Sequence, residues 1–240
     1  MAVPPFIFDL LCRAARDQGG GRACSAGYPD MLVPAEQLTA LLGAERAARI
    51  PVREDSRQIA AWHGLAKVLD RVYESRQVFR ELGYDLDVID IHAARGDEII
   101  VDLNQPLPAD FGRTYELMLD TGTCEHCFNI GQAALNLAGL VKKDGYLLQV
   151  MPLNRFDHGF YNVNPTWFYD FYPSNGFDFL FLGGVTNLVI EPKVFELPPD
   201  DPLPELPPRS NIVMVARRKE IVPLKFPMQY KYAANPDLRG

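Results

Sequence analysis

The sequence has few cysteines and no long apolar run. Its 240 residues include four cysteines, at positions 12, 24, 124 and 127, and their spacing is unlike the disulfide frameworks of small secreted domains. The longest apolar runs, such as 177–182, are far too short to cross a bilayer. The first 18 residues lack the basic start of a signal peptide and carry an acid within their apolar part. We therefore expect a protein of the reducing cytoplasm that does not enter the membrane.

The sequence also has fewer basic than acidic residues. The chain has 24 Lys and Arg against 31 Asp and Glu, which gives a net charge of −7, and this balance argues against a broad phosphate-binding surface. The sequence contains no Gly-x-Ser-x-Gly elbow, no Walker loop and no kinase motif set. These absences disfavour nucleic acid as a partner and favour a small-molecule substrate. They leave open whether the chain forms a homo- or hetero-oligomer.

What the sequence does contain is an alternation of helical and strand patterns. We expect helices over 5–18, 34–42, 56–82 (as one or two helices), 129–141 and 165–175. We expect strands over 22–27, 85–91, 98–103, 115–120, 145–152, 177–184, 187–192 and 211–220, with a Pro-rich loop over 198–208. This alternation predicts a Rossmann-like α/β fold, with a doubly wound, mostly parallel sheet and an antiparallel hairpin at one edge. The length fits one domain over 1–240, in which 1–82 is a more helical N-terminal portion.

The stretch from 115 to 172 carries the polar side chains that point most clearly to a site. An apolar strand ends in Asp-Thr-Gly-Thr and is followed by Glu125 and His126, and the next strand is followed by Asp157 and His158. In an open α/β sheet, ligands bind outside the carboxyl ends of the strands. We therefore expect these four residues to lie together at the ligand-binding edge.

Two histidines beyond adjacent strand ends suit acid–base chemistry, because imidazole titrates near neutral pH. Tyr161 and Asn162, in the same loop as His158, could grip a polar ligand. The competing interpretation is structural: His126 caps a helix, and the loop is held by its own hydrogen bonds. His63, beside Trp62 on an expected helix, is interpreted as a packing residue.

The run Cys124-Glu125-His126-Cys127 consists of residue types that bind metals, but the sequence offers no further ligands to complete a site with them. A zinc site of this type needs further ligands, and no second Cys or His pair has a matching spacing. We interpret the two cysteines as partly buried residues at the start of a helix, and we predict no metal.

Four segments between about 83 and 219 resemble class I S-adenosylmethionine (SAM) methyltransferases. GYDLDVIDIH resembles the second strand of that family, and IIVDLNQPLP resembles the third. YELMLDTGTCEH resembles the fourth strand and the Glu-His pair that follows it in many small-molecule methyltransferases. KKDGYLLQVMP resembles the turn and fifth strand, without the proline that the family usually has in this turn.

This resemblance implies both a fold and a set of cofactor contacts. Asp90 would accept the ribose hydroxyls of SAM, since a carboxylate at a strand end suits paired hydroxyls. Asp102 and Leu103 would lie at the adenine, and Asp120 would end the strand beside the cofactor.

The glycine-rich first motif of the family has two candidate places in this chain. RACSAGYPD offers Gly27, which precedes Asp90 by 63 residues (90 − 27), whereas about 20 is usual in such fingerprints. Asp70 precedes Asp90 by 20 residues (90 − 70), but the loop 71–75 after it has no glycine. We favour the strand that ends at Gly27, with an inserted helical region, because the segment around Asp70 has helical periodicity.

The resemblance implies SAM-dependent methyl transfer to an oxygen or nitrogen of a small polar metabolite. Two alternatives stand beside it. The fold could have lost SAM and could catalyse another reaction by acid–base groups, such as an internal displacement or elimination, because fold does not imply function. The chain could also be a non-catalytic partner subunit, with its N-terminal helix and Pro-rich loop as contact surfaces.

Overall fold

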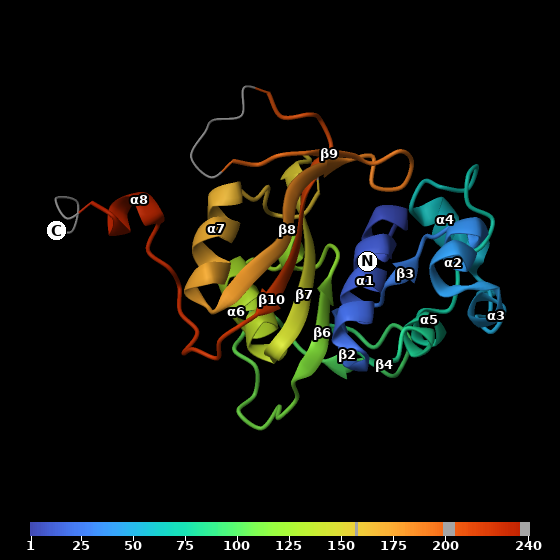
Figure 1. Ribbon diagram of the computed structural model, residues 1–240, viewed down its shortest axis with the longest axis horizontal. Helices are drawn as coiled ribbons and strands as arrows, with labels where there is room; N and C mark the ends of the chain where they lie inside the picture. The colour runs from blue at the N-terminus through green and yellow to red at the C-terminus, as the bar shows by residue number, and fades with distance from the viewer. Residues whose placement is uncertain (157, 199–204, 236–240) are drawn as a thin grey trace.

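A computed structural model describes residues 1–156, 158–198 and 205–235 of the chain. Its centre is an eight-stranded sheet in the order β5-β4-β2-β6-β7-β10-β8-β9 (Figure 1). The strands are β2 (Gly21–Ala26), β4 (Tyr84–Asp90), β5 (Ile99–Ile100), β6 (Tyr115–Asp120), β7 (Val141–Asn154), β8 (Phe177–Thr186), β9 (Lys193–Phe195) and β10 (Ser210–Arg218). A separate two-stranded sheet joins β1 (Ala2–Val3) to β3 (Asp30–Met31).

The five strands from β5 to β7 are parallel to one another, and the three strands beyond β7 pair only in antiparallel fashion. β2 pairs in parallel with both β4 and β6, and β5 and β7 extend the parallel part outward. β10 lies antiparallel between β7 and β8, and β9 is antiparallel to β8. The five parallel strands follow the 3-2-1-4-5 order of doubly wound nucleotide-binding folds. This arrangement confirms the predicted Rossmann-like, class I methyltransferase-like fold.

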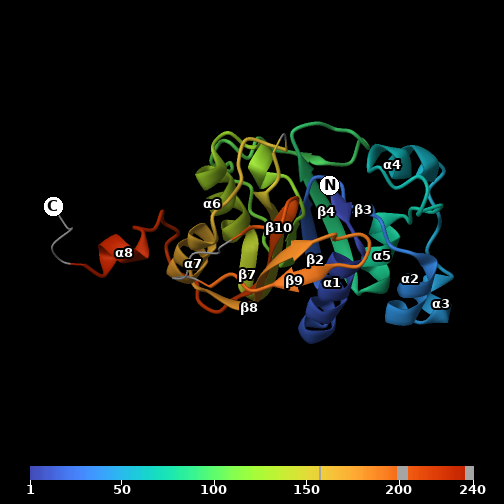
Figure 2. The same ribbon diagram turned by 90° about the horizontal axis from the view of Figure 1, so that it is seen from above.

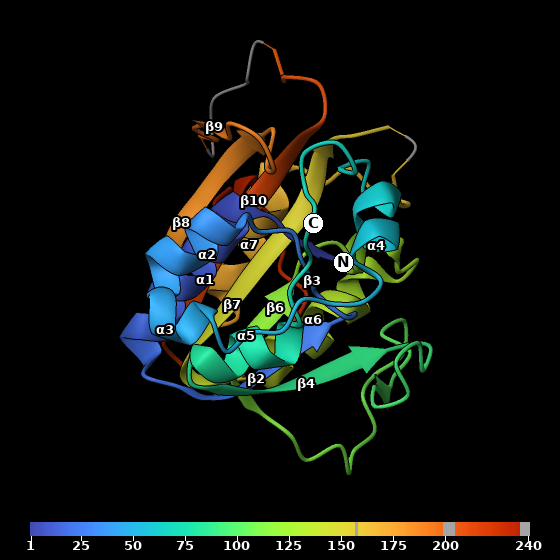
Figure 3. The same cartoon turned by 90° about the vertical axis from the view of Figure 1, so that its right-hand side faces the viewer.

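Helices cover both faces of the sheet (Figures 2 and 3). One face carries α1 (Pro5–Gln18) and α5 (Ser75–Glu81), with α2 (Ala35–Leu42), α3 (Ala44–Ala47) and α4 (Ser56–Trp62) beyond them. The other face carries α6 (Ile130–Leu140) and α7 (Pro165–Ser174). The short α8 (Tyr230–Ala233) lies away from this body (Figure 1). None of the helices in the described ranges is long and apolar enough to cross a membrane.

Local sequence signals explain where α1 begins and ends and where α7 begins. Pro5 opens α1, where its missing N–H costs nothing, and Gly19 ends it at φ +82°, a left-handed conformation that glycine adopts without strain. The side chain of Asn164 caps α7 by accepting a hydrogen bond from the Thr166 N–H (3.0 Å), and Pro165 is its first residue. The buried face of α1 packs on the sheet through residues such as Phe8.

Two expectations about the strands need correction. Residues 187–192 do not form a strand, because Asn187 and Glu191 adopt φ values of +53° and +51° and turn the chain before β9 begins. The third parallel strand is also shorter than expected, since β5 covers only two residues of the apolar run 98–103. β7 is longer than expected and already begins at the end of α6.

The chain reverses its direction of travel across the sheet at β2. From β2 it moves outward to β4 and β5, and it then returns to β6 on the other side of β2. Such a switch point leaves a crevice beyond the carboxyl ends of the two central strands, where ligands bind in open α/β sheets. The favoured choice of the first strand is thereby confirmed, because β2 ends directly before Gly27 and the segment around Asp70 is not part of the sheet.

Candidate functional site

A cavity of about 1040 Å³ opens beyond the carboxyl ends of β6 and β7. Thr121 and Gly122, the first residues after β6, form part of its wall. Its polar lining residues comprise Asp30, His63, Thr121, Glu125, His126, Arg155, His158, Asn187, Glu191, Arg209 and Asn211. Three of the four residues predicted as catalytic therefore meet at one cavity. The fourth, Asp157, lies outside the described residues.

Glu125, His126 and His158 form a cluster at this cavity. Glu125 and His126 belong to a short 3-10 helix, η1 (Cys124–His126), that follows β6, and His158 follows β7. Nε2 of His158 lies 3.3 Å from Oε1 of Glu125. The two imidazole rings meet edge to face, with their centroids 5.2 Å apart. The two loops thus bring together groups that are 32 residues apart (158 − 126) in sequence.

The loop after β7 closes tightly over Glu125. The Phe160 N–H donates to the Glu125 carbonyl oxygen at 2.8 Å. Gly159 has φ +70°, and a Cβ at this position would lie 2.8 Å from both Cγ and the carbonyl oxygen of Glu125. A side chain at residue 159 would therefore push the loop, and His158 with it, away from Glu125.

The Glu125 carboxylate is buried and incompletely paired. The residue is 1% exposed, and its Oε2 atom has no hydrogen-bond partner within the described part of the chain. A second buried carboxylate, Asp120, lies nearby: burial, and then the charge of Glu125, raise the pKa of Asp120 to about 6. A buried carboxylate without a full set of partners is costly, so a cation or a polar ligand at Glu125 would supply the missing contact.

Asp120 itself is enclosed by the protein. Its Oδ1 accepts a hydrogen bond from the Thr123 N–H, and its Oδ2 accepts one from Nε2 of Gln149, both at 2.9 Å. The Tyr172 hydroxyl donates to Oε1 of the same Gln149 at 2.5 Å. Asp120, which the resemblance assigns to the cofactor, is thus fully buried and tied to η1 and to β7.

The two cysteines that flank Glu125 and His126 point into the protein. Cys124 is fully buried, and Cys127 contacts the Thr123 carbonyl oxygen at 3.7 Å. Burial raises the thiol pKa of Cys127 to about 11 and that of Cys124 well above its ordinary value. Both thiols are therefore protonated at neutral pH, and neither is poised as a nucleophile.

Gly27 and Asp90 lie side by side at the ends of β2 and β4. The Gly27 N–H donates to the Ile89 carbonyl oxygen (2.8 Å). Gly27 adopts φ +80°, and Oδ2 of Asp90 would lie 3.7 Å from a Cβ placed on it. Met1 covers this point as well, since its Cγ would lie 2.7 Å from the same Cβ. The resemblance placed both residues at the cofactor, and the fold brings them together.

The two residues assigned to adenine differ in their surroundings. Asp102 is exposed, and its Oδ1 accepts hydrogen bonds from the backbone and side chain of Asn104, which lower the pKa of Asp102. Leu103 is buried, and its carbonyl oxygen accepts from Nδ2 of Asn136 (3.1 Å).

The two residues expected to bind the substrate form hydrogen bonds with the protein itself. The Tyr161 hydroxyl donates to the Phe128 carbonyl oxygen at 2.7 Å. Oδ1 of Asn162 accepts from the Arg155 N–H, also at 2.7 Å. Neither residue lines the cavity. The Asn162 contact lies within the loop, whereas the Tyr161 contact joins the loop to the segment after η1.

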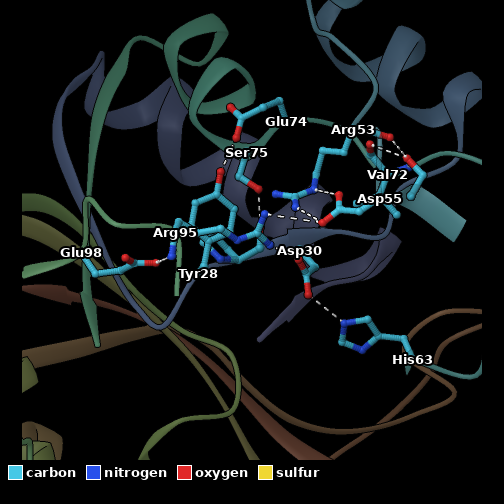
Figure 4. Close-up of polar contacts among 12 residues, drawn as sticks. Tyr28, Asp30, Arg53, Asp55, His63, Val72, Glu74, Ser75, Arg95 and Glu98 are labelled. Atoms are coloured by element: carbon cyan, nitrogen blue, oxygen red, sulfur yellow. Dashed lines mark hydrogen bonds and ion pairs between the residues drawn. The ribbon is translucent and has the colours of Figure 1, made fainter. Parts of the chain in front are cut away.

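A second polar cluster in the lining of the same cavity was not expected from the sequence. Nε2 of His63 lies 3.0 Å from Oδ2 of Asp30, toward which it points in Figure 4. The Arg95 guanidinium lies 3.6 Å from Oδ1 of Asp30 and stacks 4.3 Å from the centre of the Tyr28 ring. The prediction that His63 is a packing residue is therefore incomplete, because His63 also lines the cavity and contacts Asp30. The available sequence signal was the position of Asp30, three residues beyond the glycine that follows the first strand.

The comparisons with known proteins give likeness of fold alone. The chain matches no protein-family model and no curated protein. Among solved structures it is similar to TehB from Haemophilus influenzae, with 15% identity, 60% of this chain and 54% of TehB covered, and a TM-score of 0.37. It is also similar to the N-methyltransferase NodS from Bradyrhizobium japonicum WM9, which was solved in complex with S-adenosylhomocysteine (SAH). That match has 11% identity, covers 90% of this chain and 89% of NodS, and has a TM-score of 0.41. The matched region spans about half the length of TehB, and at these identities neither structure defines the activity of this chain.

Proposed function

We propose that this protein transfers a methyl group from SAM to an oxygen or nitrogen atom of a small polar metabolite. One observation carries the proposal: Asp90 meets Gly27 beside the switch point of the sheet, with Oδ2 of Asp90 3.7 Å from where a Gly27 Cβ would stand. A carboxylate at a strand end next to a glycine turn suits the ribose of SAM and its methionine portion. The carboxylate accepts hydrogen bonds from two ribose hydroxyls, and the glycine allows the methionine portion to approach the backbone closely.

The other predicted cofactor residues have defined parts in this proposal. Asp102 is exposed at the end of β5, on the far side of β4 from Gly27, where an adenine would extend from the ribose. Its side chain is already held in place by Asn104. Bound SAM would supply the electrophilic methyl group, and the cavity beyond β6 and β7 would hold the methyl acceptor.

The Glu125–His126–His158 cluster would receive the acceptor's proton. An imidazole takes a proton efficiently near neutral pH, and the Glu125 carboxylate 3.3 Å from Nε2 of His158 would stabilise the imidazolium that forms. The larger share of rate acceleration would come from holding the acceptor atom in line with the methyl group. The second polar cluster, with His63 and Asp30, would bind other polar groups of the acceptor, because it lines the same cavity.

Equilibrium dialysis with radiolabelled SAM tests the proposal through Asp90. Asp90→Ala removes the acceptor of the ribose hydroxyls, and hydrogen bonds to a charged group are worth about 1.5–3 kcal/mol. We therefore expect the affinity to fall roughly 10- to 100-fold while the melting temperature is retained. Asp85→Ala is the matched control, since Asp85 is an exposed residue of the same strand at its opposite end. Equal affinity of the Asp90→Ala and Asp85→Ala proteins for SAM would remove Asp90 from the site.

One observation favours a second candidate, an enzyme that works by acid–base groups without SAM. The Met1 side chain lies against Gly27, at the point where the family binds its cofactor, while the histidine cluster opens onto the cavity independently of that point. This candidate predicts no SAM binding, together with an activity that depends on His126 and His158. Methyl transfer predicts that both SAM binding and these histidines are required.

A further inference from the structure

We propose that Glu125, His126 and His158 form a binding site for one divalent transition-metal ion. Each residue offers one ligand atom, and these three atoms all lie within 4.8 Å of one another. Within the described ranges of the chain, no other group of three His, Cys, Asp or Glu side chains meets this condition. The set combines two imidazoles with one carboxylate, and it draws on both loops that form the candidate site.

The chemistry of the donors selects the kind of ion. Two histidines and one carboxylate are a ligand set of catalytic zinc sites and of non-haem iron(II) sites. The ligand group includes neither Cys124 nor Cys127, so the donors are nitrogen and oxygen rather than sulfur. An ion of the Zn²⁺, Fe²⁺ or Co²⁺ type fits this set better than Mg²⁺ or Ca²⁺, which prefer oxygen ligands.

The geometry requires only a small adjustment. Zinc–nitrogen and zinc–oxygen distances are about 2.0–2.2 Å, so two ligands of one ion lie at most about 4.4 Å apart. Glu125 is the fixed member, because it is buried and the Phe160 N–H bonds to its carbonyl oxygen. His158 is partly exposed and His126 is exposed, so both rings have room to turn toward an ion.

The unpaired oxygen of Glu125 is an independent observation that points to a cation. Oε2 is buried without a hydrogen-bond partner in the described part of the molecule, which is costly for a carboxylate. Arg155 lines the same cavity and interacts with the charge of Glu125 at longer range, but its Nη1 donates to Asn211 (3.3 Å). No ion pair within 4 Å joins Arg155 to Glu125 in the described residues. A divalent cation would supply the missing partner.

Three protein ligands leave at least one coordination position open, as in catalytic metal sites. Because the cluster lines the cavity, that position would face the space available to a ligand. An ion there would bind and polarise an oxygen of that ligand. If the ligand is the methyl acceptor, which is the one part of this inference that rests on the proposed function, the ion would lower the pKa of its hydroxyl. With the ion bound, His126 and His158 would act as its ligands and would no longer be the groups that receive the acceptor's proton.

Metal binding can be measured with Zn²⁺ and Co²⁺ alone, in tag-free protein stripped with a chelator, and without SAM. We expect one Zn²⁺ per chain by calorimetry, and visible absorption bands when Co²⁺ is added. His126→Asn and His158→Asn each remove one ligand. Each should weaken binding by at least the roughly 10- to 100-fold that loss of even an outer-shell partner costs. His92→Asn is the matched control, because His92 is an exposed histidine outside the group. Glu125→Gln should also weaken binding, but it changes a buried residue, so the two histidine variants decide.

Three results would overturn the site. The first is no binding of Zn²⁺ or Co²⁺ by wild-type protein at millimolar metal. The second is binding that His126→Asn and His158→Asn leave unchanged, which would identify an adventitious ion only. The third is loss of binding in a Cys124→Ser, Cys127→Ser double variant but not in the histidine variants, which would transfer the ion to the cysteines. None of these results bears on SAM affinity, so the metal site and the proposed methyl transfer fail or survive separately.

Discussion

Nε2 of His158 lies 3.3 Å from Oε1 of the buried Glu125. This pair joins the loops that follow two neighbouring parallel strands, β6 and β7, at the edge of the sheet where ligands bind in this class of fold. It places a partly exposed imidazole and a buried carboxylate in the lining of the same cavity. The proposed proton transfer and the proposed metal site both depend on this pair.

Replacement of Gly159 tests how closely the loop is fitted over Glu125. A Cβ at residue 159 would meet Glu125 atoms at 2.8 Å, and φ is +70°. Gly159→Ala should therefore cost about 1–3 kcal/mol of unfolding free energy from backbone strain, and more from the clash. Gly64→Ala is the matched control, because Gly64 has φ +71° and nothing within 4 Å of its Cβ position.

Denaturant unfolding of the two variants isolates the contact. Gly159→Ala should lose more unfolding free energy than Gly64→Ala. It should also lose Zn²⁺ binding or SAM-dependent activity, because His158 moves with the loop. Equal losses of stability would mean that the loop can shift away from Glu125 without cost.

The buried Asp120 predicts a specific pH dependence of stability. Its pKa is raised to about 6, first by burial and then by Glu125, against about 3.9 in an unfolded chain. The native state therefore holds the proton more tightly than the unfolded state does. The contribution of Asp120 is most favourable below about pH 4, decreases as the pH rises to about 6, and is constant above that.

Asp120→Asn removes this titration. The difference in unfolding free energy between wild type and Asp120→Asn should change by up to about 3 kcal/mol across that window, with the wild type losing stability as the pH rises. Chelator-treated protein and urea unfolding at a series of pH values give the measurement. A difference that does not vary between pH 4 and 6 would mean that Asp120 keeps an ordinary pKa.

Replacement of Gly27 tests the cofactor end of the crevice. A Cβ on Gly27 would lie 2.7 Å from Cγ of Met1 and 3.3 Å from Oγ1 of Thr123. It would also take up space that we propose for the methionine portion of SAM. Gly27→Ala should therefore lose SAH affinity by at least about tenfold, in addition to a loss of stability. Gly19→Ala, with φ +82° and open space around its Cβ position, should bind SAH as the wild type does. Unchanged SAH binding by Gly27→Ala would place the cofactor elsewhere.

The fold could be predicted because apolar runs, polar strand ends and helix signals agree over most of the chain. The strand expected over 187–192 does not form, because Asn187 and Glu191, which flank its apolar residues, adopt left-handed conformations. Composition alone does not reveal such turns, since they depend on how β8 and β9 pair.

The candidate site could be predicted in part. Glu125, His126 and His158 were identified because each follows a strand end, and strand ends of a parallel sheet meet at one edge. The pairing of His63 with Asp30 could not be foreseen, because it joins residues 33 apart through the packing of α4 beside β3. The proposed metal-ligand group could not be foreseen for a similar reason: no short spacing joins all its members in the sequence, and His158 reaches Glu125 from another loop.

A calorimetric titration of the wild-type protein with SAM and SAH decides whether this protein binds the cofactor. We predict one site per chain with micromolar affinity for both ligands. Absence of heat and of any thermal stabilisation at millimolar SAM and SAH would contradict it, and would leave Glu125, His126 and His158 as the centre of a reaction that does not use SAM.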